Sequence, residues 1–398
     1  MLTPAEASAA IAAELRPLGA EPCRLEHAAG RVLREDLAAE RDQPPFDRVA
    51  MDGIAIASVA FASGTRRFRI AGTVAAGAPP PALEDSRTCL EVMTGAVLPP
   101  GADAVIPIEL LAVSDGVATI TDAAPVPAWA NIHRQGIDAR AGSRSLASGT
   151  RLRGPELAIA ASAGRGSILV SREPRIAVIS TGDELVSPDA TLAAWQIRRS
   201  NAYGVGAVLA LAGYGYRTDA HVPDNQAVIR ATLAEHLGKH ELLVLSGGVS
   251  AGRFDFVPGV LADLGVRRVF HKVAQRPGKP LWFGMGPGGQ AVFGLPGNPV
   301  STLVCLVRYV LPALAQLTGA PAPPVTYGLL AAAYESRHTL SAFVPVDQVA
   351  DGARRGTLAL HPTQGSGDFT SLRGTAGFVE LAPGRQYAPS ESVPFYTW

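Results

Sequence analysis

The chain has 398 residues, so we expect two to four domains, because a single hydrophobic core stops growing beyond about 250 to 300 residues. Its 35 Lys and Arg residues balance 35 Asp and Glu residues. This zero net charge argues against non-specific nucleic-acid binding, which needs a basic face. Any site for an anion must therefore be local.

The composition indicates a soluble globular protein, with 47% hydrophobic and 18% charged residues. The first residues lack the positive flank and apolar core of a signal peptide, and we recognise no apolar run of membrane-spanning length. We therefore expect a cytoplasmic protein with no membrane partner. Cys23, Cys89 and Cys305 are scattered and form no CxxC motif, so we expect buried or idle thiols, not disulfides or zinc ligands.

The first predicted element is a helix from Thr3 to Leu15. Thr3 is a good N-cap, Pro4 suits the first helical position, and Glu6 is placed for a capping box. Residues from about 40 to 170 are then rich in Gly and Pro. Their short strands, at 68–70, 88–92 and 116–120, predict small β-rich domains with many turns.

The pattern changes after Pro174, where strands alternate with helices. Such alternation predicts a parallel sheet covered on both faces, with its ligand site at the carboxyl ends of the strands. We expect a linker at 320–324 and a small β-domain over 325–398. The expected strands lie at 175–180, 242–245, 269–273 and 290–293, and the expected helices at 201–211, 225–237 and 301–317.

The turns at the strand ends carry the features of an anion site. Three cations, Lys272, Arg276 and Lys279, are four and then three residues apart, the last two on a Pro-Gly turn. The segment Gly-Leu-Pro-Gly-Asn-Pro at 294–299 forms a second turn and opens onto a helix at Ser301. Backbone N–H groups and the helix dipole at such a start attract anions, while side-chain cations neutralise them.

Acidic residues are also dispersed over these loops: Asp183 and Glu184, then Asp224, then Asp255. Carboxylates beside cations suit a hard divalent metal such as Mg²⁺, which also takes ligands from substrate phosphates. The alternative is that each acid caps a helix or stabilises a turn next to Gly, and for any one acid alone this is the better interpretation.

Several weaker motifs admit two interpretations. Two interpretations, anion binding or a simple turn, stay open for Thr94, for the Gly-Gly loop that ends at Ser250 and for the segment around Ser366. His236 and His240 lie one helical turn apart, but no Glu follows His236, so we expect a solvated helix end and no zinc site. We find no nucleophile elbow, no Ser-His-Asp arrangement and no P-loop.

Taken together, these motifs resemble one family closely, the MoeA-type molybdopterin molybdenumtransferases, which include the E domain of gephyrin. The pieces that carry the resemblance occur in family order and cover nearly the whole chain. They are 45–53 with Ala-Met-Asp-Gly at 50–53, Met-Thr-Gly-Ala at 93–96, Pro-Gly-Ala-Asp-Ala-Val at 100–105, Gly-Ile-Asp at 136–138, Ser-Thr-Gly-Asp-Glu-Leu at 180–185, Ser-Gly-Gly-Val-Ser at 246–250, Pro-Gly-Lys-Pro at 277–280 and Gly-Leu-Pro-Gly-Asn-Pro-Val-Ser at 294–301.

The resemblance implies a multidomain α/β plus β fold in an elongated subunit and a homodimer. It implies a β-rich domain II at 45–130, an elongated linking domain I at 21–44 and 131–167, and an α/β molybdopterin-binding domain III at 1–20 and 168–320. Domain III would have a parallel-dominated sheet. A small C-terminal β-barrel, domain IV, would occupy 321–398.

The implied reaction is molybdenum insertion, in which molybdate and adenylylated molybdopterin give molybdenum cofactor, AMP and water. The family uses a divalent cation, usually Mg²⁺. The implied partners are a molybdopterin adenylyltransferase and client molybdoenzymes. The family's catalytic positions fall on Asp52, Thr94, Asp138, Glu184, Asp224 and Asp255, with metal ligation by Glu184, Asp224 and Asp255. Anion-binding positions fall on Lys272, Arg276, Lys279, Ser250, Gly297, Asn298, Ser301 and Ser366.

In the family, Asp52 and Thr94 face the α/β domain of the other subunit, which implies a pocket shared across the dimer. The chain also departs from the family: Arg276 stands where Lys is common, Ile137 where Glu is common, and Arg199 where Asp is usual. These changes leave open a non-catalytic paralogue or scaffold that delivers cofactor to a client molybdoenzyme. A deamidase or nucleotide hydrolase of the competence-protein group is a weaker alternative.

Overall fold

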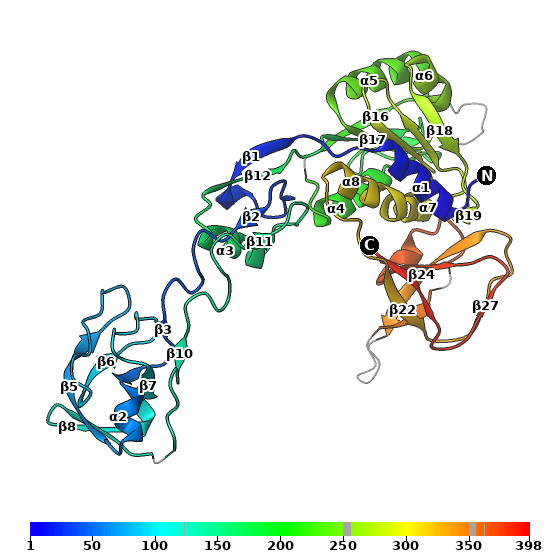
Figure 1. Ribbon diagram of the computed structural model, residues 1–398. Coiled ribbons are helices and arrows are strands. Elements are labelled where there is room, and N and C mark those ends of the chain that lie inside the picture. Colours follow the sequence, from blue (N-terminus) through cyan, green and yellow to red (C-terminus); the bar gives the residue numbers. More distant parts are fainter. Residues whose placement is uncertain (123, 216, 250–255, 350–355, 362) are drawn as a thin grey trace.

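The computed structural model describes residues 1–122, 124–215, 217–249, 256–349, 356–361 and 363–398. The molecule is elongated (Figure 1). A β-rich lobe, here called the distal lobe (residues 48–133), lies at one end, and the α/β lobe and the C-terminal barrel lie together at the other. Short antiparallel strand pairs connect the two ends. This multidomain α/β plus β architecture confirms the expected fold class.

The distal lobe is built on a six-stranded sheet in the order β7-β4-β6-β5-β9-β8. The expected strands at 68–70, 88–92 and 116–120 lie in β5, β6 and β9, and the last of them begins one residue late. Buried aromatic and aliphatic side chains, including Phe61 and Phe68, fill one face of the sheet. The elements of the lobe are β4 (Gly53–Ile56), α2 (Ser58–Ala62), β5 (Arg67–Val74), β6 (Thr88–Val92), β7 (Ala104–Pro107), η2 (Ile108–Leu110), β8 (Leu111–Ser114) and β9 (Val117–Ile120).

The connection is made by chain segments that run out to the distal lobe and back. Each outgoing strand pairs antiparallel with a returning one, so β1 pairs with β12, β2 with β11 and β3 with β10. The elements are β1 (Ala20–Arg24), η1 (Leu25–His27), β2 (Leu37–Ala38), β3 (Arg48–Val49), β10 (Ile132–His133), β11 (Arg144–Leu146), α3 (Gly154–Ser162) and β12 (Ser167–Ser171).

The α/β lobe contains a six-stranded sheet in the order β16-β13-β17-β21-β20-β18. The first four strands are parallel; β20 is antiparallel to both of its neighbours, so β18 again runs in the direction of β21. The strands are β13 (Ile176–Thr181), β16 (Arg217–Val222), β17 (Leu242–Ser246), β18 (Arg267–His271), β20 (Trp282–Met285) and β21 (Ala291–Leu295), and a short parallel pair is formed by β14 (Leu185–Val186) and β15 (Ile197–Arg198).

Helices cover both faces of this sheet, as expected. One core cluster packs the sheet against α1, α4, α7 and α8, and a second packs it against α5 and α6. The N-terminal helix begins with the predicted capping box, in which the Glu6 amide donates to Thr3 Oγ1 and the Thr3 amide to Glu6 Oε2. The helices are α1 (Pro4–Glu14), α4 (Asn201–Leu211), α5 (Gln226–Lys239), α6 (Val257–Asp263), α7 (Pro299–Cys305), the π-helical turn η3 (Leu306–Val310) and α8 (Leu311–Leu317).

Two sequence expectations about helices are wrong. The continuous helix Pro299–Leu317 is long and apolar enough to cross a membrane, but 72% of it is buried inside the protein, which is typical of a core helix. His236 and His240 do not form a solvated helix end, because they are only 7% and 8% exposed and their rings lie 4.9 Å apart. Burial, together with the neighbouring His240, lowers the pKa of His236.

The C-terminal region forms the expected barrel. Five strands close on themselves through the pairing of β24 with β26, and a sixth short strand, β19, joins from the α/β lobe. All three cysteines are buried free thiols, as expected. The elements are β19 (Gln275–Arg276), β22 (Thr326–Leu330), β23 (Tyr334–Glu335), β24 (Ser341–Val349), β25 (Thr357–Leu360), η4 (Thr370–Leu372), β26 (Gly377–Leu381), β27 (Gln386–Tyr387) and β28 (Ser392–Thr397).

Candidate active site

The predicted loops meet at one edge of the α/β sheet. The parallel strands β13, β17 and β21 all end there, and β18 ends there too because its direction matches that of β21. The loops that follow these strands carry Glu184, the Gly-Gly turn at 247–248, Asn298 and the cationic turn 276–279. This is the edge at which open α/β sheets bind ligands.

The cationic turn and the start of α7 line one cavity of about 860 Å³ between the α/β lobe and the barrel. Arg276 and Lys279 lie on it, together with Asn298 and the buried hydroxyl of Ser301. The barrel contributes Ser366, whose Oγ accepts a 2.7 Å hydrogen bond from Asn298 Nδ2. Neither cation forms an ion pair with a residue that the structure describes, so both are available to an anionic ligand.

The third predicted cation lies elsewhere. Lys272 is exposed, has a left-handed backbone with φ of 75°, and is not among the lining residues of either cavity at this edge. Its backbone amide donates to Leu281, at the other end of the loop. The spacing of the three cations in sequence therefore does not bring them into one pocket, and anion binding by Lys272 stays a prediction.

A second, smaller cavity, of about 380 Å³, holds one carboxylate, Glu184, together with Arg198 and Arg199. Glu184, Arg199 and Asn201 line it, as do Gly297 and Asn298. Asn201 Nδ2 donates to Ser246 Oγ at 2.9 Å and to the Gly297 carbonyl at 2.8 Å, which ties the start of α4 to two of the loops. Asn298 lines both cavities, so they are neighbours across this one side chain.

Local backbone geometry explains the Thr-Gly-Asp-Glu turn. Gly182 has φ of 143°, which favours glycine, and a Cβ atom there would lie 2.6 Å from a Glu184 carboxylate oxygen, so another residue would displace that carboxylate. Asp183 does not line the cavity. Its carboxylate accepts a 3.0 Å hydrogen bond from the Asp224 amide, which corresponds to the turn-stabilising interpretation.

The oxygen atoms that line the smaller cavity suit a hard divalent cation, and Arg198 and Arg199 line it as well. Ser180 Oγ and Thr181 Oγ1 are buried in its wall and have no hydrogen-bond partner among the described residues. No group of three or more His, Cys, Asp or Glu residues able to hold a metal occurs in the described part of the chain. Mg²⁺ does not need such a group, because it keeps several waters and is usually held by one or two carboxylates plus substrate phosphates.

Asp52 lies in the distal lobe and Asp138 in the connection between β10 and β11, and neither lines either cavity. The distal lobe lies at the other end of the elongated molecule (Figure 1). Asp52, between β3 and β4, accepts hydrogen bonds of 2.6 Å from the amide and the hydroxyl of Thr94. The hydrogen bond from the Thr94 hydroxyl, and after it the one from the Thr94 amide, lowers the pKa of Asp52 below its usual range. Asp138 pairs with His133 Nε2 at 2.9 Å. Gly53 is required beside Asp52, since a Cβ there would lie 1.8 Å from the Ile106 carbonyl oxygen.

Two predicted residues, Ser250 and Asp255, lie outside the residues that the structure describes. Conversely, the cavities contain residues that sequence reasoning did not select. Asn201 could have been found, because it starts a helix that directly follows a polar turn. The barrel residues His338 and His361 also line the larger cavity, but no sequence signal links them to a turn 60 or more residues earlier.

Comparisons with known proteins agree along the chain. The family model described as the MoeA N-terminal region (domain I and II) matches residues 2–164, and that described as a probable molybdopterin binding domain matches residues 177–316. A Synechocystis protein named molybdopterin molybdenumtransferase is 40% identical over 372 residues, 93% of each chain. A relative of the same name from Synechococcus elongatus is 40% identical over 306 residues, 75% of each chain.

Solved structures give the same result for the fold. The crystal structure of molybdopterin biosynthesis moeA protein from Pyrococcus horikoshii OT3 is 25% identical, covers 100% of both chains and has a TM-score of 0.82. Since identity of 40% extends over nearly the whole length of this chain and of its relative, the chain belongs to the MoeA family of molybdopterin molybdenumtransferases.

Proposed function

We propose that this chain inserts molybdenum into molybdopterin in the last step of molybdenum cofactor biosynthesis. The substrates are molybdate and adenylylated molybdopterin, and the products are molybdenum cofactor, AMP and water. Membership of the family supports this reaction. The observation that supports it in this chain is the pair of adjoining cavities, one with two unpaired cations and the other with a carboxylate, which share Asn298.

The charges suit two anionic substrates. A diphosphate and a molybdate held a few ångströms apart repel each other by several kcal/mol at an effective dielectric constant near 20. Arg276 and Lys279 offset this repulsion in the larger cavity, and the hydroxyls of Ser301 and Ser366 provide neutral hydrogen-bond donors there. Asn298 holds the α/β lobe and the barrel together at the larger cavity, because its side chain joins the start of α7 to Ser366.

Mg²⁺ is the divalent cation that we propose for the smaller cavity, which Glu184 lines. Glu184 would hold it, with the hydroxyl oxygens of Ser180 and Thr181 near by, and Asp224 and Asp255 remain the other predicted ligands. When bound, Mg²⁺ neutralises phosphate charge and polarises the phosphoryl oxygens. The contribution of the chain itself is to place Glu184 in the same cavity as Asn201, with no ion-pair partner among the described residues.

We also propose that the site is completed by a second copy of the chain. Within one chain, Asp52 and Thr94 lie on the distal lobe and Asp138 on the adjoining connection, and none of the three lines either cavity (Figure 1). A homodimer with a twofold axis would place the distal lobe of each subunit against the α/β lobe of the other. In the cytoplasm, a molybdopterin adenylyltransferase would supply the substrate and client molybdoenzymes would take the product.

A turnover assay tests the reaction. AMP release from adenylylated molybdopterin is measured with and without Mg²⁺ and molybdate, for the wild-type protein and for Glu184→Gln. The variant is expected to lose about 100-fold or more in rate. Glu235→Gln, a matched change on the exposed face of α5, should keep the wild-type rate. Tight substrate binding without AMP release would reject the enzyme and favour the non-catalytic paralogue.

Mixing two inactive variants tests the shared site. Asp52→Asn and Glu184→Gln each remove one half of the proposed site. In a mixed dimer, one of the two sites would combine the intact Asp52 of one chain with the intact Glu184 of the other. Random exchange of subunits should therefore restore about a quarter of the wild-type activity. If the mixture stays as inactive as the separate variants, the two residues do not act in one shared site.

A further inference from the structure

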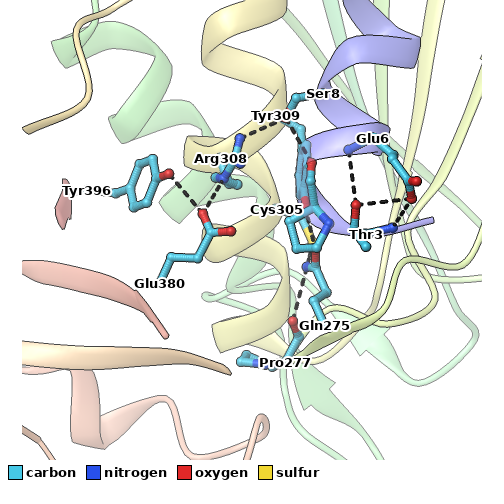
Figure 2. A network of polar contacts seen from close by, with 11 residues as sticks. Thr3, Glu6, Ser8, Gln275, Pro277, Cys305, Arg308, Tyr309, Glu380 and Tyr396 are labelled. Carbon is cyan, nitrogen blue, oxygen red and sulfur yellow. Dashed lines mark hydrogen bonds and ion pairs between the residues drawn. The ribbon is translucent and has the colours of Figure 1, made fainter. Parts of the chain in front are cut away.

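The π-helical turn η3 lies directly behind the cationic turn, and its two central polar residues face different neighbours (Figure 2). Arg308 Nε donates to Glu380 Oε2 of the barrel at 2.9 Å, and its Nη1 donates to Ser8 Oγ of α1 at 2.7 Å. The Tyr309 hydroxyl instead donates to Gln275 Oε1. A π turn has one extra residue, which changes the direction of the side chains that follow, and such turns are frequent at functional sites.

Gln275 is the centre of this arrangement. It is 0% exposed and immediately precedes Arg276. While its Oε1 accepts from Tyr309, its Nε2 donates to the Pro277 carbonyl at 3.1 Å and contacts Cys305 Sγ at 3.5 Å. One buried amide therefore holds the backbone of the turn between the two cations.

The neighbouring groups complete the support. The Cys305 thiol faces the Gly278 carbonyl at 3.8 Å, and a Cβ on Gly278 would lie 2.5 Å from Gln275 Nε2, so the turn is packed directly on this pair. Burial raises the pKa of the Tyr309 hydroxyl and of the Cys305 thiol, so both stay protonated as donors. On the other side of the turn, β19 pairs with β24, and this pairing ties Gln275 and Arg276 to the barrel.

A buried polar network of this kind has a purely structural interpretation, since it satisfies polar groups between two lobes. Two features favour a more specific role. The amide binds the turn backbone itself, not a strand or helix, and both cations that line the larger cavity are in that turn. Arg276 and Lys279 have no counter-charge among the described residues, so their positions at the cavity depend on the backbone of the turn. The Gln275 amide holds that backbone together with the β19–β24 pairing and the Val273 amide, which donates to the Lys279 carbonyl.

We propose that Gln275 and Tyr309 are positioning residues that hold Arg276 and Lys279 at the anion cavity. This inference rests on the proposed function for the nature of the anion, but not for the geometry. Without the Tyr309 hydroxyl, the Gln275 amide can rotate away from the Pro277 carbonyl, and the turn moves with its cations. Misplacement of charged groups by about 1 Å is enough to weaken binding strongly.

The test compares two tyrosines of the same network. Tyr309→Phe removes the hydroxyl that faces Gln275, and Tyr396→Phe removes the hydroxyl that donates to Glu380 at 2.9 Å. Tyr309→Phe loses a buried hydrogen bond and Tyr396→Phe a partly buried one, so both are expected to lower the unfolding temperature. Binding of inorganic molybdate and of inorganic pyrophosphate is measured by calorimetry well below that temperature. Tyr309→Phe should weaken anion binding about 5- to 20-fold, and Tyr396→Phe less than about twofold.

Gln275→Met provides a second variant if Tyr309→Phe does not fold. It should weaken anion binding at least as much, and adding Tyr309→Phe to it should cause no further loss, because the hydroxyl then has no amide to hold. In turnover, the KM for molybdate should rise in the same ratio, whereas a fall in stability alone lowers the active fraction and leaves KM unchanged.

The outcomes separate this inference from the proposed function. Equal effects of the two tyrosine variants on anion binding would overturn the positioning role, even if the wild-type protein releases AMP. Anion binding that depends on Tyr309 in a protein that releases no AMP would support the positioning role and reject the proposed reaction. If the wild-type protein binds neither anion, both are wrong.

Discussion

Removing one cation from the larger cavity should weaken anion binding by a predictable amount. Lys279→Met keeps the length of the side chain and removes its charge. A full charge pair at 4 Å would contribute about 4 kcal/mol at an effective dielectric constant of 20. Lys279 is exposed and its cavity is open to solvent, so a value of about 1.5 to 2 kcal/mol, at the lower end for charged hydrogen bonds, is more appropriate. This corresponds to a loss of about 10- to 30-fold in affinity.

The assay is the KM for molybdate in AMP release, with direct titration of inorganic molybdate as a check. Lys239→Met is the matched control, because Lys239 lies on α5, pairs with Glu235 at 2.8 Å and lines neither cavity. The difference between the two variants should shrink as salt rises, since the Debye length falls from about 30 Å at 0.01 M to about 10 Å at 0.1 M. Equal KM values for the two variants would refute the assignment of Lys279 to the anion site.

Three further predictions concern ion pairs of the α/β lobe and the turn that carries the two cations. Burial opposes ionisation of Glu241, but hydrogen bonds from two arginines outweigh the burial and lower the pKa of Glu241 from 4.5 to about 2. The stabilisation by ionised Glu241 is therefore present above pH 4.5 and is lost as pH falls through 2, and Glu241→Gln should flatten the fall in unfolding free energy over that range. Gly278→Ala, at φ of 94° and against Gln275, should lower both the unfolding temperature and anion affinity, measured as above. Arg308→Met leaves Glu380 half-buried without its cation and should cost about 3 kcal/mol in chemical unfolding.

Secondary structure followed from sequence wherever local signals were strong. The helix Asn201–Leu211 and the strand Thr88–Val92 were predicted to the residue, because polar turns bound short, strongly apolar or β-branched segments. The sequence predicts the ends of elements less well where tertiary contacts determine them. The strand expected at 269–273 ends at His271, since the chain beyond it turns away from the sheet and pairs with the barrel as β19.

The site was predicted in its residue types but not in its grouping. The spacing suggests that Lys272, Arg276 and Lys279 act together, yet Lys272, which has a left-handed backbone, lines neither cavity. The sequence did not predict the burial of His236, because Lys239 between the two histidines made the helix end look solvated. Gln275 gave no signal at all, since its role depends on a π turn 30 residues later in the chain.

The absence of ion pairs at Arg276 and Glu184, within the described part of the chain, is the clearest mark of function in this site. Elsewhere acids and arginines pair freely, as Arg308 does with Glu380 and Arg175 with Glu241. At the carboxyl edge of the sheet, Arg276 and Glu184 instead line neighbouring cavities, and neither forms an ion pair within the described part of the chain. An ion pair there would satisfy the two charges and make both unavailable to a ligand. Keeping them apart across Asn298 forgoes that stabilisation, which is expected where the missing counter-charges come from anionic substrates and a bound cation.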